Sequence, residues 1–398
     1  MQLPNFKRDI TSELAKRLTG KNHFIQVLSG PRQVGKTTAV KQVLNELQMR
    51  YHYSSADLPY PPEASWIISE WERARTLDTK AAPAILVLDE VQKIPRWSEV
   101  VKRLWDEDRS EGRNLHVVVL GSSSLLIQKG LTESLAGRFE QLHCLHWEFK
   151  ECRQCFNWDI DQYLFFGGYP GAAVLIEDET RWKSYVLDSL IESAISKDVL
   201  MLNPVEKPAL LRKLFVLACE FAAQILSYQK MLGQLTDAGN TTTLAHYQKL
   251  LESAYLIAGL EKFSGSKIRR RSSSPKWLPL NAALVTALDP KSFLETRSNP
   301  ALWGRLVECT AGIHLFNQAK KHRLELFYWR EGNLEVDYVL QKGRELIAIE
   351  VKSGRKRNVT SGLSQFEKRY KPLRSFIIGP GGMPLEEFLT SEATSLFT

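Results

Sequence analysis

The chain has 398 residues, of which 43% are hydrophobic and 25% are charged, and its formal net charge is +8. This length favours two or three domains, and the hydrophobic content excludes a wholly disordered chain. No uninterrupted apolar stretch approaches about 18 residues, so we expect no membrane span. The segment from Met1 to Arg17 carries charges throughout, which argues against a secretory signal. Five cysteines are too few for a disulfide framework, so we expect a cytoplasmic setting.

The positive charge is concentrated at the C-terminal end of the chain. Residues 1–150 carry a net charge of +3 and residues 151–265 carry −4, whereas residues 266–398 carry +9. Such asymmetry predicts separate domains with different partners. The basic C-terminal third favours a polyanionic partner such as nucleic acid.

The sequence predicts a phosphate-binding loop near the N-terminus. The apolar run Ile25–Ser29 is typical of a buried strand, and a helix-like stretch begins at Thr38. Between them the sequence fits G-x-x-x-x-G-K-[ST]. The motif and the residue after it, all expected to bind ATP, are Gly30, Pro31, Arg32, Gln33, Val34, Gly35, Lys36, Thr37 and Thr38. Glycines let backbone N–H groups surround phosphates, Lys36 would reach the β- and γ-phosphates, and the Thr37 hydroxyl would ligate Mg²⁺.

A second motif completes the predicted nucleotide site. Ile85–Leu88 is apolar and typical of a buried parallel strand, and Asp89 and Glu90 follow it. Asp89 would bind Mg²⁺ and ATP, and Glu90 would polarise the attacking water. The alternative is that Glu90 only supports the groups that touch the water. Ser122 follows the next predicted strand, and its hydroxyl would contact the γ-phosphate or the attacking water. The alternative is that it caps a helix.

Arg138 is a candidate arginine finger. It lies in the run Leu135–Phe139, and such an arginine can be worth on the order of 10³–10⁵ in rate. A finger acting in trans would imply a homo-oligomer. The alternative is a solvated or ion-paired arginine.

These motifs resemble those of prokaryotic AAA-family P-loop ATPases that are fused to a C-terminal domain of unknown function. The matching segments are Gly30–Thr37, Leu88–Pro95, Gly121–Ser124, Ser134–Phe139 and Phe166–Pro170. The resemblance implies an ATPase core, a helical lid, a winged helix and a nuclease-like α/β domain. The corresponding ranges are residues 1–155, 156–205, 206–290 and 291–398.

The middle of the chain predicts a helix-turn-helix. Helix-like stretches cover Leu210–Leu226, Ser227–Leu235 and Thr241–Leu256. The residues before the third stretch, Thr236–Asn240, are typical of a turn, and they end in a residue that can cap the helix. The third helix would expose His246, Lys249 and Ser253, and the basic run Lys267–Lys276 would lie in or beside a wing that grips DNA phosphates. The alternative is an interaction module with a solvated arginine loop.

Two β-rich runs around a glycine turn predict a hairpin in the C-terminal third. With Gly343-Arg344 as a two-residue loop, Asp337 lies opposite Glu350. Like charges at opposed positions destabilise a sheet. A shared divalent cation, a proton or a neighbouring Lys352 would offset them.

The hairpin resembles the D-x(n)-E-x-K core of restriction-endonuclease-like nucleases. The resemblance implies that Asp337 and Glu350 hold Mg²⁺ and that Lys352 stabilises or activates the nucleophile. Glu308, on a preceding helix, would be a further acidic metal ligand. Downstream, Gln365 and Tyr370 are five residues apart and miss the Q-x-x-x-Y spacing of some such nucleases, which weakens the case for one active subclass. The alternative is a salt-bridged surface hairpin.

The sequence therefore predicts an α/β fold: a P-loop NTPase parallel sheet with a helical lid, a winged helix and a small nuclease-like α/β domain. The predicted function is a Mg²⁺-dependent ATPase that uses ATP binding and hydrolysis to control a nucleic-acid-binding module. DNA is favoured over RNA, and the C-terminal module would also cut if its carboxylates are active. The alternative is a regulatory or signalling switch with an inactive nuclease-like domain that acts on a protein partner.

Overall fold

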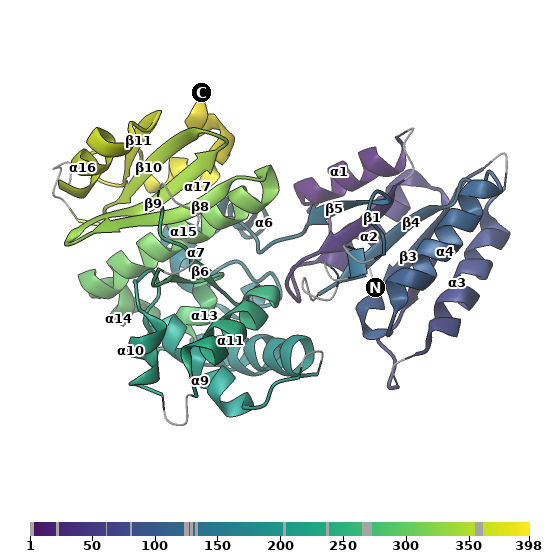
Figure 1. The fold of residues 1–398 in the computed structure, drawn as a ribbon, viewed down its shortest axis with the longest axis horizontal. Helices are drawn as coiled ribbons and strands as arrows, with labels where there is room; N and C mark the ends of the chain where they lie inside the picture. Colours follow the sequence, from purple (N-terminus) through teal and green to yellow (C-terminus); the bar gives the residue numbers. More distant parts are fainter. Residues whose placement is uncertain are drawn as a thin grey trace. The chain divides into compact units, whose positions relative to one another are not determined.

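The structure is a computed structural model, and it has the mixed α/β fold that the sequence predicts. It describes residues 4–20, 24–60, 62–79, 82–122, 127, 130–131, 134–201, 204–235, 239–264, 273–354 and 361–398. Two compact units make up the chain (Figure 1). Unit 1 comprises residues 1–145 and 197–203, and unit 2 comprises residues 146–196 and 204–398.

Unit 1 is built on a five-stranded parallel sheet. Its strands are β1 (Ile25–Ser29), β2 (Arg50–Ser55), β3 (Ala84–Asp89), β4 (His116–Gly121) and β5 (Phe139–His143). The order across the sheet is β2-β3-β4-β1-β5, and each neighbouring pair is parallel. Strands β1, β3 and β4 are buried along their whole length, which explains why they read as continuous apolar runs rather than as alternating patterns.

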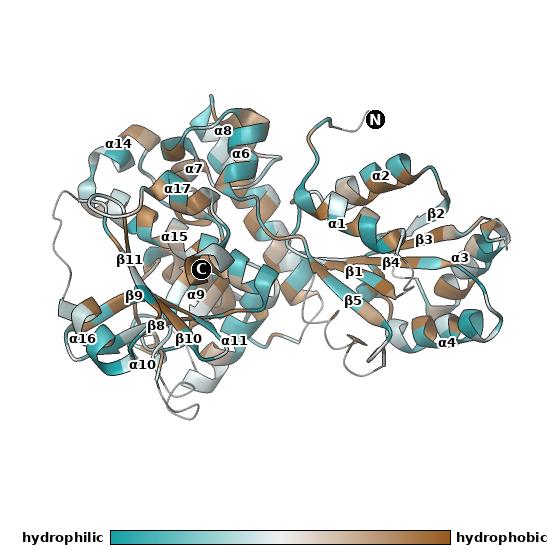
Figure 2. Cartoon of the chain, turned by 90° about the horizontal axis from the view of Figure 1, so that it is seen from above, coloured by the Kyte–Doolittle hydropathy of each residue, from teal (hydrophilic) through white to brown (hydrophobic). Residues whose placement is uncertain are grey.

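Helices cover both faces of this sheet. They are α1 (Asp9–Leu18), α2 (Lys36–Leu47), α3 (Ala64–Leu77) and α4 (Trp97–Ser110). Leu14 of α1 and Val43 of α2 belong to the apolar cluster on one face, whereas Trp71 of α3 and Leu104 of α4 belong to the cluster on the other. Figure 2 shows the sheet between these two helical layers.

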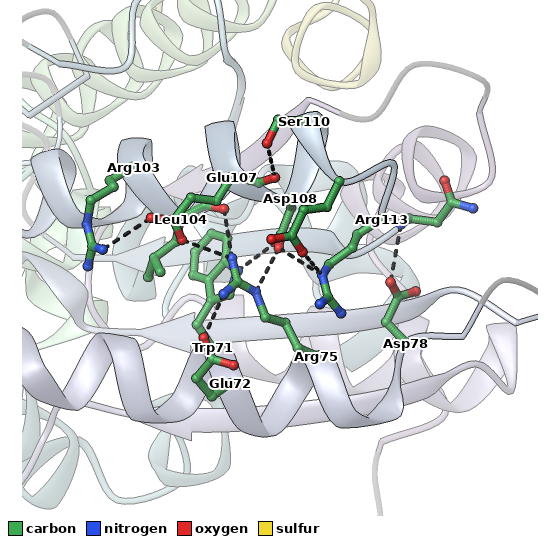
Figure 3. Close-up of polar contacts among 12 residues, drawn as sticks. Trp71, Glu72, Arg75, Asp78, Arg103, Leu104, Glu107, Asp108, Ser110 and Arg113 are labelled. Atoms are coloured by element: carbon green, nitrogen blue, oxygen red, sulfur yellow. Dashed lines mark hydrogen bonds and ion pairs between the residues drawn. The ribbon is translucent and has the colours of Figure 1, made fainter.

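A buried polar network joins α3 to α4 (Figure 3). Arg75 Nε donates a hydrogen bond to Asp108 Oδ1 at 2.7 Å, and Trp71 Nε1 donates to Asp108 Oδ2 at 2.7 Å. The Asp108 side chain is buried, so these charge-assisted bonds fix the two helices against each other.

The first half of unit 2 is mainly helical. It contains α6 (Phe149–Phe156), α7 (Ile160–Phe166), α8 (Glu179–Ser184), η3 (Tyr185–Glu192), α9 (Pro208–Glu220), α10 (Tyr228–Leu232), α11 (Thr241–Ser253), α13 (Ala282–Thr286) and α14 (Phe293–Ser298). Strand β6 (Ile257–Leu260) follows α11 in the chain, and β7 (Lys276–Pro279) comes later. The two strands pair in antiparallel fashion.

The predicted cap of the third helix is confirmed, because Asn240 Oδ1 accepts the backbone N–H of Thr243 at 2.9 Å. His246 and Lys249 are exposed on α11 as predicted. The prediction for Ser253 is wrong. This residue is buried, and its hydroxyl donates to the carbonyl of Leu250 within the helix.

The second half of unit 2 is a four-stranded sheet with helices. Its elements are α15 (Pro300–His322), β8 (Glu325–Glu331), β9 (Leu334–Lys342), β10 (Glu345–Val351), α16 (Ser361–Tyr370), β11 (Arg374–Ile378) and α17 (Leu385–Thr390). The order is β11-β10-β9-β8. Strands β8, β9 and β10 form antiparallel pairs, and β11 pairs with β10 in parallel.

The predicted hairpin register is confirmed. Lys342 pairs with Glu345, and the same register continues to Tyr338 opposite Ile349. The paired residues end there, one position before the predicted pair of Asp337 and Glu350. Gly343 has a φ of +60°, which a two-residue hairpin loop with glycine first requires. The described part of the chain contains no helix that is both long and apolar enough to span a membrane.

Candidate functional site

The glycine loop of unit 1 connects β1 to α2. Gln33 and Gly35 have φ values of +59° and +92°, so the loop turns sharply before the helix begins at Lys36. A Cβ atom at Gly30 would lie 1.9 Å from the carbonyl oxygen of Cys144. Glycine is therefore required at Gly30, and the loop ends at a helix N-terminus, where anions bind favourably.

Lys36 lies inside this loop. The residue is 8% exposed, and its Nζ donates to the carbonyl oxygens of Gly30 at 2.9 Å and Pro31 at 2.6 Å. Burial lowers the pKa of Lys36 from its usual value, against the attraction of nearby anionic groups. The loop therefore holds the ammonium group beside its own backbone, where phosphates would bind.

Thr37 and Asp89 come together from the start of α2 and the end of β3. Thr37 Oγ1 donates to Asp89 Oδ2 at 3.1 Å. The Tyr53 hydroxyl of β2 donates to the same carboxylate oxygen, and burial together with Asp89 raises the pKa of Tyr53. A hydroxyl and a carboxylate in this position are the ligand types that Mg²⁺ prefers.

Glu90 follows β3 in a left-handed backbone conformation, with a φ of +56°. Gln92 Nε2 donates to Glu90 Oε2 at 2.6 Å, and Ser122 Oγ donates to the same oxygen at 3.3 Å. Burial raises the pKa of Glu90, while Arg32 and Lys36 oppose that shift. The structure thus brings the predicted Glu90 and Ser122 together after neighbouring strands. Ser123 and Ser124, quoted in the same motif, lie outside the described residues.

Asp198 is a residue that sequence reasoning missed. It lies on η4 (Ile195–Leu200), and Arg32 of the glycine loop donates to it through Nε at 2.7 Å and Nη2 at 2.8 Å. The same Ser122 hydroxyl lies 2.8 Å from Asp198 Oδ1, so its single proton is shared between Glu90 and Asp198. A signal was present in the sequence, because Asp198 shares a helical face with the apolar Ile195 and is almost completely buried there.

The segment that carries Asp198 also bears on the predicted lid. Residues 197–203 belong to unit 1, although the residues on both sides of them belong to unit 2. The range 156–205 is therefore divided between the two units. The chain leaves unit 2, contributes Asp198 to the glycine-loop site and then returns to unit 2.

Arg138 lies at the amino ends of the strands, whereas the glycine loop lies at their carboxyl ends. It precedes Phe139, which pairs with Ile25 at the start of β1, whereas the loop follows the other end of that strand. Its guanidinium donates to Asp106 through Nε at 2.7 Å and Nη2 at 3.0 Å. Within its own chain Arg138 is thus an ion-paired arginine away from the nucleotide loop.

A second polar cluster lies in unit 2, around the buried Lys276 at the start of β7. Its Nζ lies 2.6 Å from Glu308 Oε1, 3.3 Å from Glu335 Oε1 and 3.5 Å from Asp337 Oδ1. Burial would lower the pKa of Lys276, but the three carboxylates outweigh it and raise that pKa. The prediction that the basic side chain of Lys276 lies in or beside a wing that grips DNA phosphates is therefore wrong, because this side chain is buried among carboxylates. The preceding Lys267–Ser272 lie outside the described residues.

The predicted hairpin carboxylates lie beside this cluster. Asp337 Oδ2 accepts the backbone N–H of Val351 at 2.8 Å, and Lys352 Nζ donates to Glu350 Oε1 at 2.7 Å. Burial, with Asp337 as the next cause, raises the pKa of Glu350 to about 7, and the same causes raise that of Glu308 to about 7. In the described ranges, no group of three or more His, Cys, Asp or Glu side chains is arranged to hold a metal ion.

The parallel sheet of unit 1, with a glycine loop between β1 and α2 and an acidic pair after β3, defines a P-loop NTPase fold. Residues 22–153 match the family described as AAA domain. Residues 157–295 and 303–392 match two families described as domains of unknown function, DUF8612 and DUF4143.

Similar proteins come from bacteria and archaea. The chain is 24% identical over 254 residues to an uncharacterized protein of Haemophilus influenzae, a match that covers 59% of this chain and 61% of that protein. It is 24% identical over 350 residues to one of Methanocaldococcus jannaschii, covering 82% and 74% of the two chains. Among solved structures, the Walker-type ATPase of Pyrococcus abyssi is similar with a TM-score of 0.50 and 16% identity over 71% of this chain and 95% of that one. This likeness supports the fold.

Proposed function

We propose that the protein is a cytoplasmic, Mg²⁺-dependent ATPase. The observation that carries the proposal is the 3.1 Å contact between Thr37 and Asp89 beside the buried Lys36 of the glycine loop. ATP and Mg²⁺ fit these residues. The backbone leaves no room for a Cβ atom at Gly30, the loop ends at a helix N-terminus where anions bind favourably, and the two oxygen ligands suit a hard cation.

The proposed roles follow from the positions of the side chains. Lys36 would bind the β- and γ-phosphates, with the backbone of residues 30–38 around them. Thr37 and Asp89 would hold Mg²⁺, which supplies charge neutralisation at the transferring phosphoryl group. Glu90 would orient the attacking water, and its raised pKa moves this carboxylate toward the range of an effective general base. Ser122 would support Glu90 through their hydrogen bond.

Two variants test these assignments. Lys36→Ala should abolish ATP binding, and Glu90→Gln should keep ATP binding but reduce turnover by about 100-fold or more. Lys16→Ala is the matched control, because Lys16 is an exposed lysine of α1 and should leave both properties unchanged. Undiminished turnover in Lys36→Ala and Glu90→Gln would overturn the proposal.

We further propose that ATP controls a nucleic-acid-binding module in the C-terminal third. Residues 266–398 carry a net charge of +9, and α11, which precedes this third in the chain, exposes His246 and Lys249. The order of three helices and an antiparallel strand pair, α9-α10-α11-β6-β7, is that of a winged helix, which supports DNA rather than RNA. The order α15-β8-β9-β10-α16-β11 supports the predicted nuclease-like fold.

Asp198 offers a physical route for this control. Arg32 lies in the phosphate loop, and its guanidinium donates two hydrogen bonds to Asp198. A nucleotide phosphate would compete with Asp198 for the same guanidinium. Release of Asp198 would act on a segment whose flanking residues belong to unit 2, so nucleotide state would reach the rest of the chain.

The second candidate function is a signalling switch with a protein partner and an inactive nuclease-like domain. The burial of Lys276 among the predicted metal ligands favours it over a nuclease. Binding of labelled DNA at increasing salt separates the two candidates. A nucleic-acid module predicts binding that falls steeply with salt, whereas a purely protein-directed switch predicts little affinity at physiological salt.

A further inference from the structure

The nuclease-like carboxylates of unit 2 converge on an ammonium group of the chain itself. Lys276 Nζ contacts Glu308 from α15 at 2.6 Å and Glu335 from β9 at 3.3 Å. Asp337 of β9 offers its side chain at 3.5 Å and its backbone carbonyl at 3.3 Å. Lys276 is completely buried, and its ammonium also lies 4.9 Å from the centre of the Tyr338 ring.

These contacts occupy the place that a divalent cation would need. A set of carboxylate oxygens with one backbone carbonyl is the ligand set of a hard cation such as Mg²⁺ or Mn²⁺. Mg²⁺ requires oxygen ligands at about 2.0–2.1 Å in near-octahedral geometry. An ammonium group at the shared centre of the same oxygens excludes such an ion, because two like charges cannot occupy one site.

The remaining hairpin carboxylate is also paired with a lysine. Lys352 Nζ lies 2.7 Å from Glu350 Oε1, and Glu350 is buried. The four acids Glu308, Glu335, Asp337 and Glu350 therefore share two ammonium groups from the same chain. This pairing reduces their mutual repulsion without a bound metal.

We propose that Lys276 is the resident cation of the Glu308–Glu335–Asp337 cluster, so that unit 2 does not use a divalent metal there and does not cleave nucleic acid. The inference rests on the nuclease-like fold proposed above. With Lys276 in place of a metal ion, the nuclease-like fold would bind nucleic acid without cutting it. The ammonium group also balances part of the negative charge of the three carboxylates. Removal of the lysine should create the metal site that the carboxylates otherwise resemble.

The test is a Mn²⁺ titration of the full-length protein without nucleotide, followed by electron paramagnetic resonance. Wild type and Glu308→Gln should bind Mn²⁺ equally, because Glu308 holds no metal in the wild type. Lys276→Met should bind Mn²⁺ at least about tenfold more tightly than wild type. The double variant Lys276→Met with Glu308→Gln should lose that gain. Any Mn²⁺ that binds at Thr37 and Asp89 would be common to all four proteins, so it would cancel in these comparisons.

Loss of Mn²⁺ binding in Glu308→Gln relative to wild type would overturn the proposal, and this comparison stands even if Lys276→Met fails to fold. Mg²⁺-dependent DNA cleavage by wild type that disappears in Asp337→Ala would also overturn it. If a well-folded Lys276→Met variant binds Mn²⁺ with the same affinity as wild type, the proposal is also overturned. ATP turnover measured on the same samples reports on unit 1, so a failed ATPase proposal would be distinguishable from a failed metal proposal.

Discussion

The buried pair between Arg32 and Asp198 leads to a quantitative prediction. Asp198→Asn keeps the shape of the side chain and an oxygen that accepts the hydrogen bond of Ser122. It removes the negative charge of the carboxylate to which Arg32 donates two short hydrogen bonds. The Asp198 side chain is 1% exposed and that of Arg32 is 19% exposed. Removing one partner of a buried pair costs about 3–5 kcal/mol of stability. Because Arg32 is partly exposed, we expect Asp198→Asn to lower the free energy of unfolding by about 3 kcal/mol.

Hydrogen exchange of the fully buried strands β1, β3 and β4 measures this loss in unit 1 specifically. A loss of about 3 kcal/mol corresponds to exchange that is roughly 100-fold faster for globally protected amides. The matched control is Asp57→Asn, which breaks an ion pair with Lys93 whose acid is 61% exposed. That control should cost less than about 1 kcal/mol. Equal exchange in the two variants would refute the role of Asp198 as a structural partner of the glycine loop.

Two further predictions concern Glu148 and Arg138. Burial and Glu151 raise the pKa of Glu148 to about 7, so the unfolded chain loses this proton at lower pH than the folded one, and wild-type stability should fall as pH rises from about 4.5 to 7. Glu148→Gln keeps the acceptor for Gln318 and should flatten that slope in urea unfolding; an unchanged slope would contradict it. Arg138→Ala should lower the free energy of unfolding by less than about 1 kcal/mol. An arginine finger that acts in trans predicts that ATP turnover per molecule rises with protein concentration in the wild type and that this rise is lost in Arg138→Ala. The same concentration dependence in Arg138→Ala as in the wild type would exclude the trans role.

The parts predicted well from sequence depend on short-range patterns. The glycine loop and the acidic pair after β3 each occupy a few consecutive residues, and burial on both faces made their strands read as apolar runs. The hairpin register from Lys342–Glu345 to Tyr338–Ile349 followed from one two-residue turn, because the turn sets the pairing of the residues that flank it. Such features require no knowledge of distant parts of the chain.

The parts that sequence reasoning missed depend on contacts between distant residues. Asp198 lies 166 residues from Arg32 in the chain, and Lys276 lies 61 residues from Asp337. Lys276 ends a basic run, and its sequence neighbours before it predict that it shares the role of that run. Trp277 and Leu278 after it belong to a buried strand. A single charge next to an apolar strand can point to solvent or to buried acids, and only the fold decides between them.

Control of the C-terminal module by ATP is tested most directly by the DNA affinity of Glu90→Gln, measured by fluorescence anisotropy at fixed salt with and without ATP. This variant should hold ATP without turning it over, so the two nucleotide states can be compared at equilibrium. We predict that ATP changes the dissociation constant for DNA by at least about fivefold. Equal affinity in both states, or no measurable DNA binding in either, would contradict that control.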